Sequence, residues 1–597
     1  MNPIVNKFSI NIATINGSGS QSANMILMRS IFNMGIPVSG KNLFPSNIAG
    51  LPTWFTIRVD KDGYMACVRD SEILIAMNEA TVDDDIAKMK PGTIVIVSDK
   101  LPLKQKRADL TYFACPFTEI AGKHTTDASM KKLMTNTAYV GAVAHLLGID
   151  QAAIDHAVTK QFGAKKQKAI DLNLGVIRSG REWAEKNLSA HVPYRVEKMD
   201  KTQGKIIIDG NAASALGAMF AGCTFVAWYP ITPSSSLPES MIGYMQKYRM
   251  DKATKKNTFA IVQAEDEIAS IGMVLGAGWA GARSCTSTSG PGISLMSEFV
   301  GLSWFAEIPA VIFDVQRVGP STGLPTRSMQ GDLLKTYWLS HGDTRHILLI
   351  PSSVSECFDM AVEAFELAEK YQTTVFVMTD LDLGMNNWMS EPFKYPTAPI
   401  KRGKVLDAEG LEKAGKFARY KDVDGDGIPY RTLPGTKHPM AAYFTRGSGH
   451  NESSGYTEKP EDYKNLLDRI QRKIEGAKHD VPAPVQTGDA DAAVGVIAYG
   501  TSDYAVQEAL DELRKKGLKV SYLRVRGLPL NGHVKEFIEK HKRVYIVEQN
   551  QLAQLTAILK TELPVDVKKL HPVLHYDGIP LDAPFVVNAI ASREKEF

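Results

Sequence analysis

The sequence is poor in cysteine, in long apolar runs and in any excess of charge, and each shortage removes a class of protein. Only five cysteines occur among 597 residues, and no two of them are close in sequence. Such a set argues against a disulfide framework, and against an iron–sulfur site, whose thiolates usually stand at short spacings. If this protein moves electrons, we expect the cluster on another chain.

The longest apolar candidate for a membrane span, residues 299–313, is interrupted by Glu307 and Pro309. The first residues lack the basic start and long apolar stretch of a signal peptide. Lysine and arginine number 69 against 66 acidic residues, a net charge of +3, which is too balanced to indicate nucleic-acid binding. We expect a cytoplasmic protein that binds neither nucleic acid nor membrane.

The length predicts several domains, and the pattern of elements divides the chain into four parts. Residues 1–188 begin with a strand, a Gly-rich turn and a helix. Residues 205–390 alternate strands and helices, which is typical of a parallel sheet with helices on both faces. Residues 491–597 form a second, smaller α/β domain. The remaining stretch, 391–490, is rich in Gly, Pro, Lys and Asp, and we expect an irregular excursion on the surface.

Two features stand out in this excursion. One is an amphipathic helix with apolar side chains at positions 463, 467, 470 and 474. The other is Asp-Val-Asp-Gly-Asp-Gly at 422–427, which imitates a calcium loop but has Leu433 where a bidentate Glu is required. It also imitates a thiamine-diphosphate magnesium motif, without the preceding apolar strand. An Asp/Gly turn is the favoured interpretation, an adventitious divalent ion stays open, and we assign no metal ligand to this chain.

The clearest chemical motif is Tyr-Pro-Ile-Thr-Pro-Ser-Ser at 229–235, directly after a predicted strand. Tyr229 and Pro230 open this turn, whose two prolines fix the backbone and remove two N–H donors. The hydroxyl of Thr232 then lies on a rigid turn at the carboxyl edge of the sheet, where ligands of open α/β sheets bind. A helix start with Ser and Thr caps explains the motif equally well.

Three acids, Glu265, Asp266 and Glu267, stand where a helix predicted over 266–282 begins. Stabilisation by the helix dipole accounts for Glu265 and Asp266. Glu267 opens a helix that is apolar on every side, so we expect its carboxyl group to point into the protein. Small residues at positions 269, 272, 276 and 280 of this helix let another backbone or subunit approach closely.

Arg317 follows a strand predicted over 310–315. A guanidinium at the end of a strand can hold a carboxylate through two parallel hydrogen bonds. A surface ion pair is the commoner role of such an arginine.

Taken together, these motifs resemble the α subunit of 2-oxoacid:ferredoxin oxidoreductases over almost the whole chain. The same signature includes Gly-Asn-Ala-Ala-Ser-Ala-Leu-Gly-Ala at 210–218 and Thr-Ser-Thr-Ser-Gly-Pro-Gly at 286–292. The resemblance implies an α/β fold of several domains, with a pyrimidine-binding-type thiamine domain preceded by a γ-like domain and followed by a transketolase-C-like domain. In the last of these, Ala553 stands where the family usually has Gly.

The resemblance also implies roles for individual residues. Thr232 would hydrogen-bond the 2-oxoacid near its reacting centre, and Arg317 would contact the carboxylate side of the substrate. Glu267 would face the aminopyrimidine of thiamine diphosphate and favour the imino tautomer that removes the C2 proton, with Tyr229 and Pro230 also at the cofactor. The turn formed by Gly17, Ser18 and Gly19 suits a phosphate of coenzyme A at a helix N-terminus, although a tight turn alone explains its glycines.

The implied reaction is oxidative decarboxylation of 2-oxoglutarate with coenzyme A and ferredoxin, or its reductive reverse. The fused γα layout and the Tyr-Arg-Thr-Leu-Pro-Gly segment at 430–435 favour this substrate; pyruvate or a branched-chain 2-oxoacid is the alternative. A separate β subunit would bring the pyrophosphate–Mg²⁺ site and a [4Fe–4S] cluster, in an (αβ)₂ assembly. The rival hypotheses are a non-catalytic scaffold and a self-contained thiamine enzyme.

Overall fold

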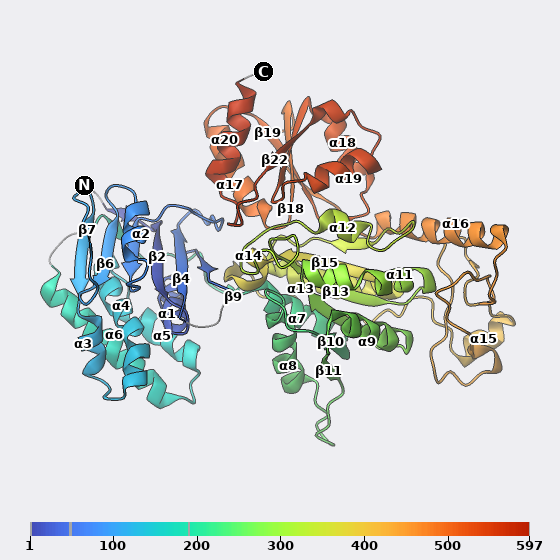
Figure 1. The fold of residues 1–597 in the computed structure, drawn as a ribbon, viewed down its shortest axis with the longest axis horizontal. Coiled ribbons are helices and arrows are strands. Elements are labelled where there is room, and N and C mark those ends of the chain that lie inside the picture. Colours follow the sequence, from blue (N-terminus) through green and yellow to red (C-terminus); the bar gives the residue numbers. More distant parts are fainter. Residues whose placement is uncertain (1–2, 47–49, 105, 189–191, 596–597) are drawn as a thin grey trace. The chain divides into compact units, whose positions relative to one another are not determined.

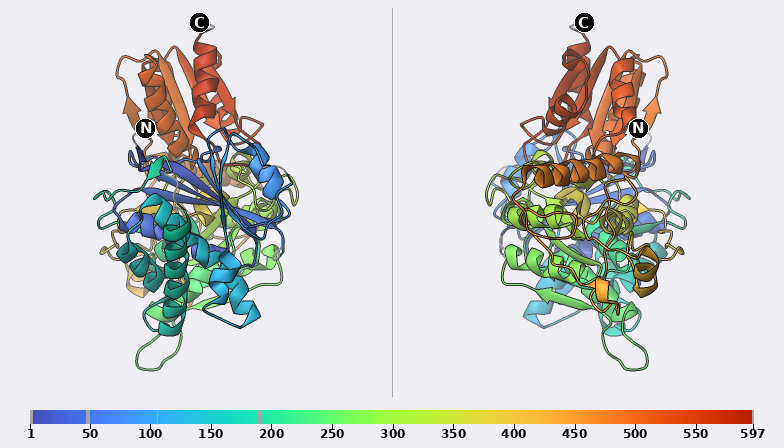
Figure 2. Two further views of the ribbon diagram at one scale, coloured as in Figure 1. Left: turned by 90° about the vertical axis from the view of Figure 1, so that its left-hand side faces the viewer. Right: turned by 90° about the vertical axis from the view of Figure 1, so that its right-hand side faces the viewer.

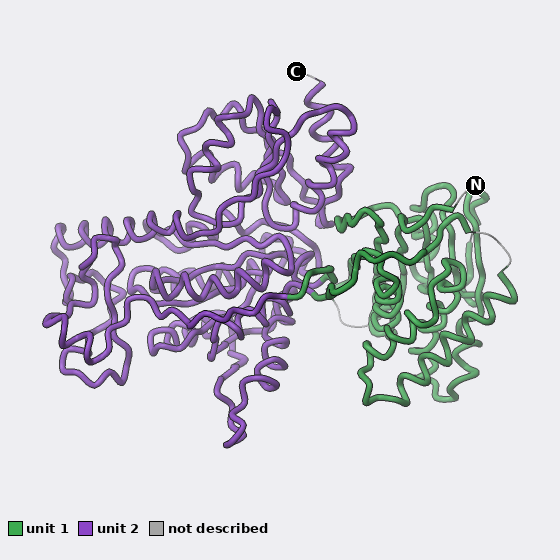
Figure 3. The backbone as a smooth tube through the Cα atoms, turned by 180° about the vertical axis from the view of Figure 1, so that it is seen from behind, with its two compact units in different colours: residues 1–208, 386–392 green, residues 209–385, 393–597 purple. Residues whose placement is uncertain are grey.

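The computed structural model describes residues 3–46, 50–104, 106–188 and 192–595. They form two compact units, shown in green and purple in Figure 3. Unit 1 comprises Met1–Ile208 with Asn386–Pro392, and unit 2 comprises Asp209–Met385 with Phe393–Phe597. Each unit is built on its own sheets. The α/β fold of several domains that the sequence predicts is confirmed, while the four-part division of the chain stays a prediction.

Unit 1 is a six-stranded sheet in the order β3-β4-β2-β5-β6-β7, covered by helices. Strand β4 is antiparallel to β2 and β3, and the remaining pairs are parallel. The strands are β2 (Lys7–Ile15), β3 (Val38–Leu43), β4 (Pro52–Asp60), β5 (Ile73–Ala76), β6 (Ile94–Ser98) and β7 (Thr111–Cys115). The helices are α1 (Ser20–Asn33), α2 (Val82–Lys88), α3 (Phe117–Gly122), α4 (Ala128–Leu147), α5 (Gln151–Phe162) and α6 (Gln167–Asn187).

Two short strand pairs complete unit 1. They are β1 (Ile4–Val5) with β8 (Tyr194–Arg195), and β9 (Ile206–Ile208) with β16 (Trp388–Ser390). The second pair brings the chain back into unit 1 after the large sheet of unit 2. There the ammonium of Lys41 lies 3.2 Å from the ring centroid of Trp388, which ties this returning segment to β3.

Unit 2 contains a seven-stranded sheet in the order β11-β10-β12-β13-β15-β14-β20, parallel except for β20 (Figure 1). Its strands are β10 (Phe225–Trp228), β11 (Ala260–Gln263), β12 (Ser284–Thr288), β13 (Ala310–Gln316), β14 (Ile347–Leu349), β15 (Thr374–Asp380) and β20 (Gly527–Leu528). Its helices are α7 (Gly210–Phe220), α8 (Ser236–Tyr248), α9 (Glu267–Trp279), α10 (Gly290–Leu295), α11 (Ser297–Ala306), α12 (Leu333–Tyr337), α13 (Val354–Tyr371) and α14 (Leu381–Met385).

Successive side chains of a strand point to opposite faces of the sheet, so neighbouring residues of β13 pack against different sets of helices. Ala310 and Ile312 of β13 share a core with α9, α10, α11 and α12, whereas Val311 and Phe313 share one with α7, α8 and α13. Both faces are therefore covered, as expected for a parallel sheet.

A second sheet of unit 2 has five strands in the order β17-β19-β18-β21-β22, with β17 antiparallel to its neighbour. The strands are β17 (Val485–Gly488), β18 (Val494–Tyr499), β19 (Val520–Val525), β21 (Arg543–Glu548) and β22 (Leu570–Leu574), and the helices are α17 (Ser502–Lys515), α18 (Gly532–Lys540), α19 (Gln554–Glu562) and α20 (Ala583–Glu594). Apolar residues of this sheet, such as Ile497 and Leu523, belong to the same core as Ile312. The two sheets of unit 2 therefore share one apolar core.

Residues 391–490 are largely irregular, as expected, but they are not only a surface excursion. Helix α16 (Pro460–Gly476) packs Leu466, Ile470 and Ile474 on Trp304 of α11. Figure 1 and the right-hand view of Figure 2 show α16 running beside the helices of the large sheet. The shorter α15 (Ala408–Ala414) lies in the same stretch.

The buried face of α16 differs from the predicted one. Tyr463 is 52% exposed and Leu467 is only half-buried, whereas Arg469 and Lys473 are buried. Apolar spacing identified Ile470 and Ile474 correctly but missed part of the face, because two of its buried positions carry cations. Both cations bind the carboxylate of Glu307, which lies at the end of α11.

Candidate functional site

The carboxyl ends of four neighbouring strands, β10, β11, β12 and β13, lead into the four motifs of the sequence. Residues 229–235 follow β10, and the acids 265–267 follow β11. Ser289 and the start of α10 follow β12, and Arg317 follows β13. Parallel strands end at the same edge of a sheet, so the fold gathers these motifs where ligands of such sheets bind.

Arg317 and Thr232 are in direct contact at this edge. Nη1 of Arg317 donates to the backbone oxygen of Thr232 at 2.7 Å, and Nη2 donates to the backbone oxygen of Thr322 at 3.2 Å. The side chain is buried, and its Nε has no hydrogen-bond partner among the described residues. Burial lowers the pKa of Arg317, and the carboxylates of Asp332 and Glu267 oppose that shift. The guanidinium still has N–H groups that could donate to a carboxylate.

Glu267 is the first residue of α9, and it is buried, whereas Glu265 is exposed. Asp266 caps the helix by accepting a hydrogen bond from the backbone N–H of Ala269 at 2.6 Å. A Cβ atom on Gly292 would lie 2.9 Å from Cγ of Glu267, so this side chain packs against the first turn of α10. In the described part of the chain, the carboxyl group of Glu267 makes no hydrogen bond or ion pair.

The turn at 229–235 is held by hydrogen bonds from two sides. Asn211 of α7 donates to the oxygen of Pro233 and to Oγ of Ser236, both at 2.8 Å, and Oγ of Ser235 accepts from the backbone N–H of Ile231 at 2.9 Å. Tyr229 and Pro230 are exposed at the sheet edge. The motif therefore does both things expected of it. It leads directly into α8, and it lies at the sheet edge where ligands bind.

Two buried carboxyl groups, Asp314 and Asp332, were missed from the sequence. Asp314 lies within β13, and neither of its oxygens has a hydrogen-bond partner within the described ranges. Burial and the neighbouring Asp332 raise the pKa of Asp314 well above its usual value. Burial also raises the pKa of Asp332 to about 6, although Lys335 and Arg317 act in the opposite direction. The sequence did contain a sign of Asp314, because it is a single acidic residue within the otherwise apolar run 310–315.

Gly17, Ser18 and Gly19 belong to unit 1 and connect β2 to α1. Both glycines have positive φ, and a Cβ atom on Gly19 would come within 2.6 Å of Cδ2 of Leu133. Asn136 of α4 donates to the backbone oxygen of Ser18 at 2.8 Å and to its Oγ at 3.1 Å. The predicted strand–turn–helix is present and the positive φ angles explain both glycines, while coenzyme A binding by this turn stays a prediction.

The loop at 422–427 is an Asp/Gly turn whose carboxylates are already engaged. Oδ1 and Oδ2 of Asp422 accept from the N–H groups of Gly425 and Gly427, both at 2.9 Å. Lys404 pairs with Asp424 at 2.6 Å and with Asp426 at 2.8 Å. Among the residues that the structure describes, no cluster of three or more His, Cys, Asp or Glu side chains could hold a metal ion.

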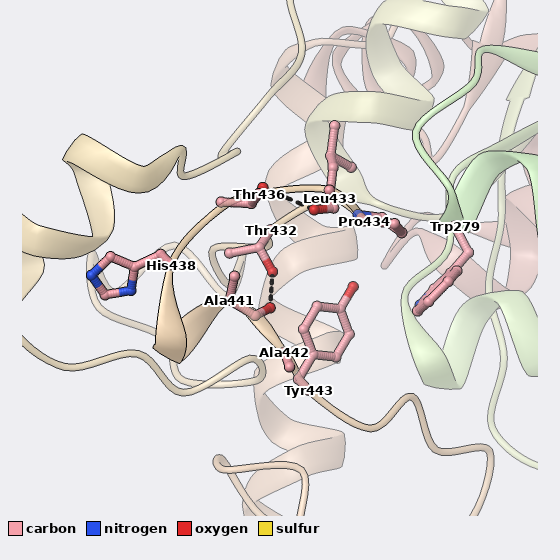
Figure 4. A pocket seen from close by; sticks show the side chains of 10 residues that line it. Trp279, Thr432, Leu433, Pro434, Thr436, His438, Ala441, Ala442 and Tyr443 are labelled. Carbon is pink, nitrogen blue, oxygen red and sulfur yellow. Dashed lines mark hydrogen bonds between the residues drawn. The ribbon is translucent and has the colours of Figure 1, made fainter.

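Figure 4 shows a separate hollow of about 280 Å³ between α9 and the irregular stretch. It lies beside Trp279, the last residue of α9 and roughly 18 Å along the helix from Glu267. In its wall, Thr432 donates to the backbone oxygen of Ala441 at 2.6 Å. The lining residues are Trp279, Thr432, Leu433, Pro434, Gly435, Thr436, His438, Ala441, Ala442 and Tyr443. The segment at 430–435 thus lies at the far end of α9 from the strand-edge site.

No described helix is long and apolar enough to cross a bilayer.

Two family models match the chain. Residues 216–410 match "Pyruvate flavodoxin/ferredoxin oxidoreductase, thiamine diP-bdg", and residues 9–183 match "Pyruvate ferredoxin/flavodoxin oxidoreductase". The first match contains Thr232, Glu267 and Arg317. The second lies within unit 1.

Similar proteins agree with these matches. The α subunit of 2-oxoacid:ferredoxin oxidoreductase 2 from Aeropyrum pernix is 30% identical, over 96% of each chain. The 2-oxoglutarate synthase subunit KorA from Methanothermobacter marburgensis is 37% identical over 58% of this chain and 87% of its own. The 2-oxoglutarate:ferredoxin oxidoreductase of Magnetococcus marinus, solved with 2-oxoglutarate, coenzyme A and succinyl-CoA bound, is 28% identical. Its structure matches 98% of this chain and 99% of its own, with a TM-score of 0.87. The chain therefore belongs to the 2-oxoacid:ferredoxin oxidoreductases, a family of multi-subunit oxidoreductases, and corresponds to their α subunit.

Proposed function

We propose that this chain is the α subunit of a 2-oxoglutarate:ferredoxin oxidoreductase. With coenzyme A and oxidised ferredoxin, the complex would convert 2-oxoglutarate reversibly to succinyl-CoA, CO₂ and reduced ferredoxin. The main support for 2-oxoglutarate as the substrate is the structural likeness, at a TM-score of 0.87, to an enzyme solved with 2-oxoglutarate and succinyl-CoA bound. The relative from Methanothermobacter marburgensis, a 2-oxoglutarate synthase subunit, supports the same substrate.

Pyruvate or a branched-chain 2-oxoacid is the second candidate substrate. Two observations favour it: both family models carry pyruvate in their descriptions, and the relative from Aeropyrum pernix is named for 2-oxoacids in general. The likeness to the Magnetococcus marinus enzyme outweighs them because it covers almost the whole of both chains.

Arg317 would hold the carboxylate side of the 2-oxoacid. Its contacts with the backbone oxygens of Thr232 and Thr322 fix the plane of the guanidinium and leave the second N–H of each terminal nitrogen for the substrate. Thr232 stands beside it, so its hydroxyl would hydrogen-bond the same substrate near the reacting carbon. Such fixed donors lower the barrier by orienting the substrate before the reaction begins.

Glu267 would bind the pyrimidine of thiamine diphosphate. Glu267 is buried as a residue, and its carboxyl group makes no hydrogen bond within the described ranges, so it is free to bond a ring nitrogen that shares a proton with it. When bound, thiamine diphosphate supplies the electron sink that decarboxylation of a 2-oxoacid needs. The part of this chain would be to hold that proton at the ring nitrogen, with Tyr229 and Pro230 at the exposed rim of the site.

The rest of the machinery would come from partners and from unit 1. A β subunit would supply the pyrophosphate–Mg²⁺ site and a [4Fe–4S] cluster, ferredoxin would accept the electrons, and the assembly would be (αβ)₂. In unit 1, the turn at Gly17, Ser18 and Gly19 would contact coenzyme A through its N–H groups. A cytoplasmic location also stays a prediction.

Co-expression of this chain with a candidate β subunit tests the proposal. Viologen reduction is followed with coenzyme A and 2-oxoglutarate, pyruvate or branched-chain 2-oxoacids. Turnover with 2-oxoglutarate that neither chain gives alone supports the reaction and the division of labour. Preference for another 2-oxoacid selects the second candidate. No turnover with any of them, from a brown and fully assembled complex, refutes the proposed chemistry. Tight thiamine diphosphate binding by the isolated chain would favour a self-contained enzyme instead.

A further inference from the structure

The loop that carries Arg317, residues 317–332, is here called the arginine loop. Its ends meet, because the backbone N–H of Asp332 donates to Oε1 of Gln316 at 3.0 Å. Within it, the N–H of Leu324 donates to the oxygen of Val318 at 3.0 Å, and the N–H of Val318 donates to the oxygen of Arg327 at 3.2 Å. A loop with joined ends and internal bonds is compact, as an Ω-loop is.

Gln330 fixes this loop to the five-stranded sheet through its backbone. Its N–H donates to the oxygen of Gln549 at 2.8 Å, and its oxygen accepts from Nδ2 of Asn550 at 3.1 Å and from the hydroxyl of Tyr499 at 3.3 Å. Tyr499 ends β18, and the other two residues directly follow β21. The carboxyl edge of this second sheet therefore holds the loop.

The side chain of Gln330, which is 1% exposed, is bonded at both ends. Its Nε2 donates to Oδ2 of Asp380 at 3.0 Å and to Oγ1 of Thr501 at 3.2 Å, and its Oε1 accepts from Oγ of Ser502 at 3.2 Å. Asp380 ends β15 of the large sheet, whereas the two hydroxyls belong to the start of α17. One amide thus joins the arginine loop to both sheets of unit 2.

Further contacts on either side of Gln330 restrain the loop. The N–H of Ser328 donates to the oxygen of Gly578 at 2.9 Å, and Nε2 of Gln554 donates to the oxygen of Gly331 at 2.6 Å. Since Nη2 of Arg317 is itself bonded to Thr322 of the loop, the position of the loop sets the direction of the guanidinium.

We propose that Gln330 is a positioning residue for Arg317, through which the five-stranded sheet helps to select the 2-oxoacid. The proposal rests on the proposed function of Arg317 as the holder of the substrate carboxylate. Gln330 itself touches no substrate; it fixes the loop whose geometry aims the guanidinium. Displacement of such a group by about 1 Å costs on the order of a hundredfold in rate.

The test is Gln330→Leu in the assembled complex with its β subunit, alongside Ser502→Ala, which removes one bond to the amide of Gln330 and one from Nε2 of Gln549. Gln372→Leu is the matched control, because Gln372 is also fully buried in unit 2 and donates to Pro429 of the irregular stretch. The readouts are kcat, the KM values for 2-oxoglutarate and for coenzyme A, and hydrogen exchange across residues 317–332.

We expect Gln330→Leu to raise the KM for 2-oxoglutarate about ten- to a hundredfold, with a smaller fall in kcat and an unchanged KM for coenzyme A. Amide exchange in the arginine loop accelerates, and Ser502→Ala shows both effects more weakly. Gln372→Leu lowers stability without moving that KM. An unchanged KM for 2-oxoglutarate, or unchanged loop exchange in a folded Gln330→Leu complex, overturns the proposal. If Gln330→Leu does not fold, an unchanged KM and unchanged exchange in Ser502→Ala overturn it. Hydrogen exchange can be measured without turnover. It therefore shows whether Gln330 fixes the arginine loop even if the proposed function is wrong.

Discussion

Replacing Glu307 by Gln is expected to destabilise unit 2 by about 3–5 kcal/mol, because it leaves two buried cations without their carboxylate. Glu307 is fully buried and accepts from Nη1 of Arg469 at 3.1 Å, from its Nη2 at 2.5 Å and from Nζ of Lys473 at 2.8 Å. Burial alone would raise the pKa of Glu307, but Arg469, Lys473 and Arg419 outweigh it and lower the pKa to about 2. That shift from 4.5 corresponds to about 3 kcal/mol, in agreement with the first figure.

Urea unfolding followed by tryptophan fluorescence at pH 7 measures the effect. Glu409→Gln is the control, because Glu409 and Lys413 form an exposed pair one helical turn apart, worth about 0.3–0.5 kcal/mol. Lys473→Met should cost less than Glu307→Gln, since it leaves the bond between Glu307 and Arg469 in place. A loss for Glu307→Gln no larger than that of Glu409→Gln, or a larger loss for Lys473→Met, would refute the reasoning.

Three further predictions concern single residues. Ala553 has φ of 52° and ψ of 52°, so Ala553→Gly should raise the free energy of unfolding by about 1 kcal/mol; no gain in urea unfolding contradicts this. Burial lowers the pKa of His346 to about 4, so stability should fall as pH drops from 6.5 to 4, by about 3 kcal/mol. That loss should be absent in His346→Gln; an equal loss would assign it to other groups. Arg317→Lys should lower kcat/KM for 2-oxoglutarate about a hundredfold in the viologen assay, because an ammonium cannot hold Thr232, Thr322 and a carboxylate in one plane; a change under threefold would exclude that role.

The sheets and the strand-edge grouping could be predicted from the sequence because both follow from local pattern. The apolar runs that became β13 and β15 were recognised to within one residue, and the strand and turn pattern placed Thr232 and Arg317 each after a strand. Glu267 was grouped with them through the family resemblance. The burial of Glu267, beside an exposed Glu265, also followed from its position at the start of an apolar helix.

What the sequence did not predict depends on contacts between distant residues. Gln330 bonds Thr501 and Asn550, which are 171 and 220 positions away, and no periodicity marks such a residue. The same holds for α16, whose buried face includes Arg469 and Lys473. In a sequence, Arg469 and Lys473 indicate a solvent-exposed face of the helix. Only the structure shows that the carboxylate of Glu307 neutralises both of them in the interior.

Exchange of the C2 proton of thiamine diphosphate tests most directly that the strand-edge site is the catalytic centre. The measurement compares deuterium incorporation at C2 in wild-type, Glu267→Gln and Glu265→Gln complexes assembled with the β subunit. We predict that Glu267→Gln slows exchange by at least a hundredfold, in line with the loss of a positioned acid–base group. Glu265→Gln, which removes the exposed neighbouring carboxylate, should exchange at the wild-type rate. Wild-type exchange in a Glu267→Gln complex that still binds the cofactor would contradict the account.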